Sequence, residues 1–252
     1  MLVRIEGREI VIQMDGAIAF RNVNYEVDGR NIIEDVTGTF HKGGITTVVG
    51  PSGAGKSTAF RLCNGLRSAT SGDITIEGMH IRDYAPIELR RIVGIALQQA
   101  TMITGSVREN LELPRTLRNM HLTQEEAEEY IDVVGLGKEY LDRDSKDLSG
   151  GQKQKLSIAR TLVNRPKILL LDEITSSLDR ISTQEIEELI VHINRKYETT
   201  VIWITHHLEQ AMRIGTHAWV MMDGTLIESG TTEVLKNPTD ERVRQFIKGE
   251  VE

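Results

Sequence analysis

The spacing of apolar residues changes along the chain, and each spacing predicts a different kind of element. Residues 17–49 alternate β-branched and polar side chains and are interrupted by turn residues at Asp28-Gly29 and at Lys42-Gly43-Gly44, which predicts strands and hairpins. From residue 87 to about 165 the spacing becomes mostly helical. The pattern therefore predicts an α/β fold whose helical stretch is inserted into the sequence of the core.

Two nearly continuous apolar runs, 167–172 and 201–205, follow the helical stretch. Strands of this composition are typical of a parallel sheet that is covered on both faces. Between them, apolar residues recur at helical spacing at Ile186, Leu189, Ile190, Ile193 and Tyr197. Residues 219–229 predict a hairpin that turns at Asp223-Gly224, and Thr123 with Glu126 predicts a capping box at the start of a helix.

Composition narrows the class of protein. The 252 residues are 39% hydrophobic and 27% charged, with a net charge of −7. This balance is typical of a soluble globular protein and disfavours non-specific nucleic-acid binding, which needs a basic surface. No apolar run reaches the length of a membrane span. The N-terminal segment has early charges and no signal-peptide core, so we expect a cytoplasmic protein. The single cysteine, Cys63, excludes an internal disulfide.

The strongest motif is Gly50-Pro51-Ser52-Gly53-Ala54-Gly55-Lys56-Ser57, which matches the P-loop pattern without a mismatch. A β-branched run, 45–49, precedes it and a helical pattern, 57–66, follows. Glycines let the backbone approach a phosphate, and the helix N-terminus favours an anion. The predicted nucleotide contacts are Gly50, Ser52, Gly53, Ala54, Gly55, Lys56, Ser57 and Thr58. Ser57 is expected to hold Mg²⁺.

Two further motifs lie downstream of the P-loop. Residues 169–173 form an apolar strand that ends in Asp172-Glu173, as in a Walker B motif. Such a strand brings Asp172 to the sheet edge beside the P-loop, where it would hold Mg²⁺, while Glu173 would orient or deprotonate the attacking water. Residues 148–152, Leu-Ser-Gly-Gly-Gln, open a helix and predict a second anion-binding N-terminus. The simplest hypothesis is that this second N-terminus binds the phosphate of a nucleotide held by another copy of the chain.

Together these motifs make the chain resemble the nucleotide-binding subunit of an ATP-binding-cassette (ABC) transporter. The resemblance implies a P-loop NTPase with a RecA-like core, an N-terminal antiparallel β-subdomain and an inserted α-helical subdomain. It implies one ABC ATPase domain over residues 1–252, with the core and β-subdomain in about 1–86 and 166–252 and the helical subdomain in about 87–165. It also implies a head-to-tail dimer that holds two ATP molecules between its subunits.

The resemblance assigns further roles residue by residue. Tyr25 corresponds to the aromatic residue that stacks on adenine, although an exposed strand tyrosine is the alternative. Gln98 corresponds to the Q-loop glutamine that contacts Mg²⁺ and the lytic water; the neighbouring Gln99 is the alternative, and the strand register favours Gln98. His206 corresponds to the switch histidine. The signature residues Ser149, Gly150, Gly151 and Gln152, together with Asp179 of the D-loop, are implied to serve the nucleotide site across the dimer.

The segment 171–176 has Ile174 where the wider family usually has proline. With residues 105–111 and 117–119, it resembles a branch whose subunits pair with small permeases in iron export and plant aluminium tolerance. The implied function is ATP-driven transport by a separate membrane permease, with the subunit on the inner face of the cell membrane. Two alternatives are a soluble ABC ATPase that acts on nucleic acid or ribosomes, and a P-loop kinase, in which the signature would have no role.

Overall fold

The central sheet of the molecule has six strands in the order β12-β11-β5-β10-β9-β8. The computed structural model describes residues 2–5, 8–11 and 16–249. The strands of this sheet are β5 (Ile45–Val49), β8 (Val93–Ala96), β9 (Ile168–Asp172), β10 (Thr200–Ile204), β11 (His217–Met222) and β12 (Thr225–Thr231). Only β12 pairs antiparallel, with β11; the others pair parallel. The predicted strands and the predicted hairpin at Asp223-Gly224 are thus confirmed.

Alternate residues of the central strands face two different hydrophobic clusters. In β9, Leu169 and Leu171 belong to one cluster and Ile168 and Leu170 to the other. All four side chains are inaccessible to solvent. Because successive side chains of a strand point to opposite faces, a strand covered on both faces must be apolar throughout. This explains the uninterrupted apolar runs.

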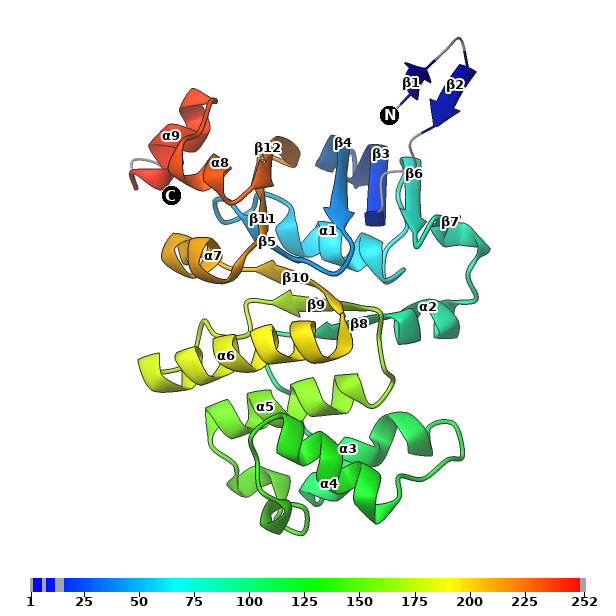
Figure 1. Cartoon of the computed structure of the whole chain (residues 1–252), viewed down its shortest axis with the longest axis vertical. Coiled ribbons are helices and arrows are strands. Elements are labelled where there is room, and N and C mark those ends of the chain that lie inside the picture. Colours follow the sequence, from blue (N-terminus) through cyan, green and yellow to red (C-terminus); the bar gives the residue numbers. More distant parts are fainter. Residues whose placement is uncertain (1, 6–7, 12–15, 250–252) are drawn as a thin grey trace.

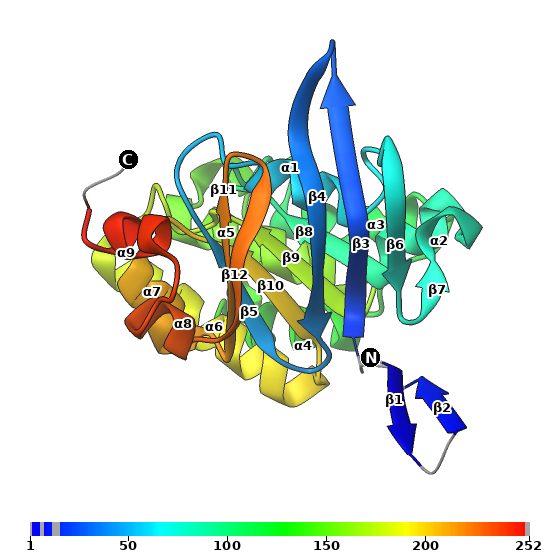
Figure 2. The same ribbon diagram turned by 90° about the horizontal axis from the view of Figure 1, so that it is seen from above.

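A second, antiparallel sheet lies beside the central one and has the order β4-β3-β6-β7. Its strands are β3 (Gly16–Val27), β4 (Arg30–His41), β6 (Ser71–Ile76) and β7 (Met79–His80). Figure 2 shows β3, β4 and β6 side by side at one flank of the molecule. The aromatic rings of Phe40 and Trp219 stack with centroids 3.8 Å apart, which joins β4 to β11 of the central sheet. Two further strands, β1 (Leu2–Ile5) and β2 (Arg8–Val11), pair with each other.

The helices surround the central sheet and also form a separate layer (Figure 1). They are α1 (Lys56–Cys63), α2 (Pro86–Ile92), α3 (Val107–Thr116), α4 (Gln124–Val133), α5 (Gly150–Leu162), α6 (Arg180–Tyr197), α7 (Leu208–Ile214), α8 (Glu233–Lys236) and α9 (Glu241–Ile247). Helix α1 ends earlier than predicted, because Asn64 caps it and Gly65 follows with a positive φ of 67°. Within the described part of the chain, no helix combines the length and hydrophobicity of a membrane span.

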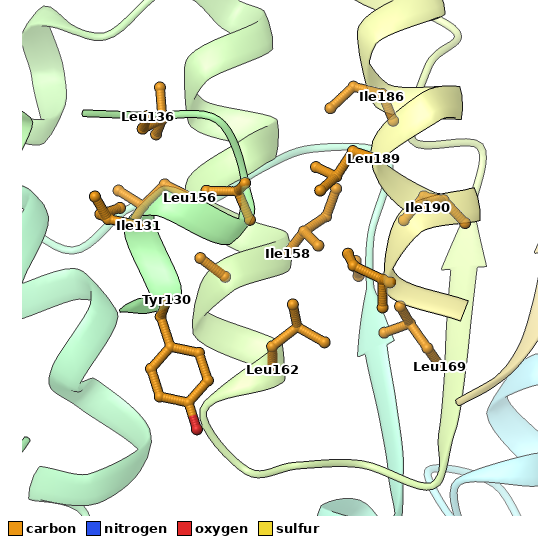
Figure 3. Packing of buried hydrophobic residues seen from close by; sticks show 14 of the residues in the cluster. Tyr130, Ile131, Leu136, Leu156, Ile158, Leu162, Leu169, Ile186, Leu189 and Ile190 are labelled. Atoms are coloured by element: carbon orange, nitrogen blue, oxygen red, sulfur yellow. The ribbon is translucent and has the colours of Figure 1, made fainter. Parts of the chain in front are cut away.

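Helix α5 joins the helical layer to the central sheet. Figure 3 shows its residues Leu156, Ile158 and Leu162 between side chains of α4 on one side and of α6 and β9 on the other. The range predicted as helical, 87–165, also contains β8, which pairs in parallel with β9. The helical part therefore begins after β8, and residues 93–96 belong to the central sheet. The ends of the predicted 1–252 domain lie partly outside the described residues.

The capping box at the start of α4 is confirmed and can be tested. The Thr123 hydroxyl accepts a hydrogen bond from the Glu126 N–H, and the Glu126 carboxylate accepts one from the Thr123 N–H. We expect Thr123→Ala to lower the free energy of unfolding by about 1 kcal/mol, measured from the urea midpoint. Thr183→Ala, inside α6, is the control; it should be neutral or slightly stabilising because alanine has the higher helix propensity. Equal losses in both variants would contradict the capping role.

Candidate nucleotide-binding and catalytic site

The loop between β5 and α1 has a shape that only glycine allows at two positions. Gly50 has φ 147°, and a Cβ there would lie 1.9 Å from the carbonyl oxygen of Met221. Gly55, the N-cap of α1, has φ 89°, and a Cβ there would lie 2.8 Å from the carbonyl oxygen of Ile32. Both conformations are unfavourable for other residues. Glycine therefore lets the loop pack closely against Met221 and Ile32, and the loop leads directly into the N-terminus of α1, where an anion is favoured.

Lys56 lies inside this loop with only 5% of its surface exposed. Its ammonium group donates to the carbonyl oxygens of Gly50 and Pro51, both at 2.7 Å. Burial lowers the pKa of Lys56, and the charges of Glu173 and Asp172 partly oppose this effect. A buried cation held only by neutral carbonyls would be stabilised by an anion in the loop.

The end of β9 brings the predicted metal ligands together. The Ser57 hydroxyl donates to Oδ1 of Asp172 at 3.1 Å. Burial raises the pKa of Asp172, and the hydrogen bond from Ser57 opposes that shift. A cation next to this carboxylate would favour its charged form. Hydroxyl and carboxylate oxygens are the ligands that Mg²⁺ accepts from proteins beside substrate phosphates, so this pair fits the metal.

Glu173 and His206 form the second pair of the site. Nε2 of His206 lies 2.5 Å from Oε1 of Glu173. Glu173 has a positive φ of 52°, and its N–H donates to the carbonyl oxygen of Ile204 at the end of β10. The chain thus leaves the extended conformation after Asp172, and the two adjacent carboxylates have different partners, Ser57 and His206. Positive φ is uncommon for glutamate and is found preferentially at functional sites.

Lys56, Ser57, Glu173 and His206 line one hollow of about 300 Å³. Its lining residues are Ile32, Ser52, Gly53, Ala54, Gly55, Lys56, Ser57, Thr58, Glu173 and His206. Sequence reasoning missed Ile32. Its signal was the pair Ile32-Ile33, which breaks the alternation of β4: Ile33 is fully buried and Ile32 is only partly buried. A partly buried apolar side chain at the mouth of a phosphate-binding loop can contact a flat base.

Apart from the signature and the D-loop, four predicted residues do not line the hollow: Gly50, Asp172, Tyr25 and Gln98. Tyr25, on β3 opposite Ile33, packs partly against the hydrophobic cluster beneath the sheet. Gln98 is exposed after β8, and its amide donates to the Ser176 hydroxyl at 2.9 Å. That hydroxyl donates to the carbonyl oxygen of Glu173 at 2.9 Å. The Ser176 side chain thereby connects Gln98 to the backbone of Glu173.

Helix α5 holds the loop that carries Gln98. The Gln154 amide donates to the carbonyl oxygen of Leu97, and the Arg160 guanidinium donates to that of Thr101, at 3.2 and 2.8 Å. These two carbonyls flank Gln98 on either side. The helix that begins at the signature sequence is therefore fixed to the predicted Q-loop through its own side chains.

The signature sequence itself lies at the exposed start of α5. Ser149 is the N-cap, and its hydroxyl accepts from the N–H of Gln152 in a complete capping box. Gly150 is exposed. A Cβ on Gly151 would lie 3.0 Å from the Ser182 hydroxyl, which donates to Asp179, the N-cap of α6. The signature and the predicted D-loop are thus neighbours, and neither lines the hollow at the P-loop.

Comparisons with known proteins identify relatives over most of the chain. The family model described as ABC transporter matches residues 33–176. The protein YjkB of Bacillus subtilis (strain 168), named as an ABC transporter ATP-binding protein, is 45% identical over 238 residues, which are 92% of this chain and 94% of YjkB. The methionine import ATP-binding protein MetN of Haemophilus ducreyi is 38% identical over 243 residues, covering 92% of this chain and 70% of MetN.

A solved structure agrees with the fold. The dimeric post-hydrolysis structure of the ATP-binding cassette MJ0796, bound to ADP and Pi, matches with a TM-score of 0.74 and 28% identity. The match covers 85% of this chain and 98% of that one.

Proposed function

The chain belongs to the ATP-binding subunits of the ABC transporter family, and from that premise we propose how its own residues bind ATP, hydrolyse it and drive a permease. As a member of this family it is an ATPase. One observation carries the proposal: Lys56, the adjacent pair Asp172-Glu173, and His206 come from three separate segments of the chain and gather around the P-loop.

The P-loop is proposed to bind the phosphates of ATP. The backbone N–H groups of residues 52–58 would surround the β-phosphate, and the Lys56 ammonium would exchange its two carbonyl partners for phosphate oxygens. Ser57 and Asp172 would hold Mg²⁺, which supplies charge neutralisation at the phosphates. Tyr25 is proposed to contact adenine, although it lies outside the hollow, while Ile32 is the apolar residue at its mouth.

Glu173 is proposed as the general base and His206 as its partner. A carboxylate at the end of a strand, 2.5 Å from an imidazole, is held in one orientation and can accept a proton from a water molecule at the γ-phosphate. His206 would donate to the γ-phosphate or to Glu173 and keep both in place. Gln98 would respond to changes at the γ-phosphate through its hydrogen bond to Ser176, which in turn bonds to the Glu173 carbonyl. Positioning and charge stabilisation then account for most of the catalysis.

A second copy of the chain is proposed to complete each site. The start of α5 is exposed at Ser149 and Gly150, and the signature residues Ser149, Gly150, Gly151 and Gln152 are separate from the hollow of the same chain. In a head-to-tail dimer, the signature of one copy would face the γ-phosphate held by the other, with Asp179 nearby. The matched cassette with ADP and Pi is dimeric, which supports this arrangement. ATP would favour the closed dimer by its higher affinity for it.

The membrane partner is proposed to be a separate integral permease, which would hold the subunit on the inner face of the cell membrane. Residues Met102, Ile103 and Lys153 line a hollow of about 350 Å³ next to the Gln98 loop. A helix of the permease could dock there and follow movements of that loop. The soluble ABC ATPase and the kinase are not favoured by the relatives, which are ATP-binding proteins of transporters.

The direction of transport and the transported substrate are the subject of a narrower proposal. The resemblance at Ile174 and at residues 105–111 supports metal-ion export of the iron type. The name of the relative MetN describes methionine import, and this favours the opposite direction. Transport assays with radioactive iron and with radioactive methionine, in vesicles that contain the chain with its permease, would distinguish iron export from methionine import.

Affinity purification from detergent-solubilised native membranes tests the transporter proposal. We expect a polytopic membrane protein to co-purify in fixed ratio, because the subunit has to act on a permease. The control is the same purification from a strain without the tagged chain. Recovery of the chain only from the soluble fraction, with nucleic acid or ribosomes, would contradict the proposal.

A further inference from the structure

A buried glutamine on α7 has polar partners on both of the loops that carry Glu173 and His206. Gln210 has 2% of its surface exposed. Its carbonyl oxygen accepts from the Thr205 hydroxyl at 2.5 Å, and its amide nitrogen donates to the Thr175 hydroxyl at 3.2 Å and to Glu187 at 2.8 Å. Thr205 precedes His206, and Thr175 lies two residues after Glu173. None of the roles proposed above uses this amide.

The orientation of the Gln210 amide is fixed by an ion pair behind it. Glu187, which is 4% exposed, is bound by both Nε and Nη2 of Arg213 at 2.7–2.9 Å. Both oxygens of Glu187 accept hydrogen bonds from the guanidinium, so Glu187 is an acceptor in this network. The nitrogen of the Gln210 amide must therefore face Glu187, and its oxygen must face Thr205.

This orientation determines the hydrogen bonds of Thr205 as well. Its hydroxyl donates its only proton to Gln210, so its lone pairs are free to accept the N–H of His207 at 3.0 Å. That N–H belongs to the peptide that joins His206 to His207. The His207 N–H thus donates to Thr205, Thr205 donates to Gln210, and Gln210 donates to Glu187, which also accepts from Arg213. A buried network whose members are all satisfied fixes one geometry.

We propose that Gln210 is a positioning residue for ATP hydrolysis, because its amide sets the loop of His206 against the loop of Glu173. This inference rests on the roles proposed for Glu173 and His206. The Gln210 amide bonds to both loops. The distance between the two loops therefore depends on where α7 holds this amide. The same two loops carry His206 and Glu173, whose Nε2 and Oε1 lie 2.5 Å apart.

Gln210→Met keeps the length of the side chain and removes its polar atoms. We expect kcat for ATP hydrolysis to fall roughly 10- to 100-fold, since small displacements of catalytic groups have effects of this size. The equilibrium dissociation constant for a fluorescent ATP analogue should be unchanged, because the P-loop is separate from the network. Unchanged kcat, or a parallel loss of nucleotide affinity, would overturn the proposal.

Gln210→Glu provides a readout that a purely structural role would not move. When protonated, the introduced carboxyl can donate to Glu187 and accept from Thr205; when ionised, it repels Glu187 and has no proton to donate. We expect the ratio of its kcat to that of the wild type to fall as the pH rises from about 6 to about 9. A ratio independent of pH would overturn the proposal, even if Gln210→Met does not fold.

Two controls separate this inference from the proposed function. Gln184→Glu is the same substitution on the exposed face of α6, where the Gln184 amide donates to Glu188, and its kcat ratio should not change with pH. Glu173→Gln tests the catalytic site itself. If Glu173→Gln is inactive while both Gln210 variants behave as the wild type, this inference alone fails. If Glu173→Gln has normal turnover, the catalytic assignment fails.

Discussion

Glu173→Gln is expected to bind ATP normally and to hydrolyse it about 10²- to 10⁴-fold more slowly, the usual contribution of a general base. The amide has the shape of the carboxylate and can keep a contact with His206, but it cannot accept a proton from water. Asp172, the Ser57 hydroxyl and Lys56 are not altered, so the groups that hold the nucleotide remain. Single-turnover hydrolysis and equilibrium binding of ATP measure the two effects separately.

The same variant should also accumulate as an ATP-bound dimer, because hydrolysis is the step that reopens the proposed closed state. Light scattering with ATP, compared with ADP, measures this mass change. Glu209→Gln, an exposed position in the first turn of α7, is the control and should have wild-type turnover and remain monomeric after hydrolysis. Wild-type turnover in Glu173→Gln would remove Glu173 from the role of base.

Lys56→Ala is expected to raise the dissociation constant of ATP by about 100-fold or more. Hydrogen bonds between charged groups contribute roughly 1.5–3 kcal/mol each, and each 1.4 kcal/mol is about tenfold in affinity. The substitution removes the only lysine that lines the hollow and leaves the carbonyl groups of Gly50 and Pro51 without its ammonium. Isothermal titration with ATP and magnesium measures the change.

Lys138→Ala, at an exposed position, controls for the loss of a positive charge elsewhere in the chain. Its affinity for ATP should equal that of the wild type. Circular dichroism and a urea midpoint verify that Lys56→Ala is folded. A folded Lys56→Ala with wild-type affinity for ATP would show that the P-loop lysine does not reach the phosphates.

The elements of the site were predictable where short motifs determine the local backbone. The P-loop has its turn, its glycines and its lysine within eight consecutive residues, so its geometry depends little on distant segments. Asp172 and Glu173 follow directly from an apolar strand that ends at the sheet edge. The hairpin at Asp223-Gly224 was also a local signal.

Features that depend on segments far apart in the sequence were not predictable. The sequence indicates a strand just before Gln98, but the place of this strand, β8, in the sheet depends on pairing with β9, which lies far away in the sequence. Ile32 reaches the P-loop only because β4 crosses above Gly55. The Gln210 network joins α6, α7 and two loops, and nothing in the local spacing of these polar residues indicates that they meet.

Helix α5 has one exposed end at Ser149 and side-chain bonds to the two carbonyls that flank Gln98. A helix of 13 residues is about 20 Å long, and this one is packed on both sides. It therefore behaves as a stiff rod. In the proposed dimer, a displacement of the signature end by the nucleotide of a second copy would move the loop of Gln98 at the same time, because both are attached to this one helix.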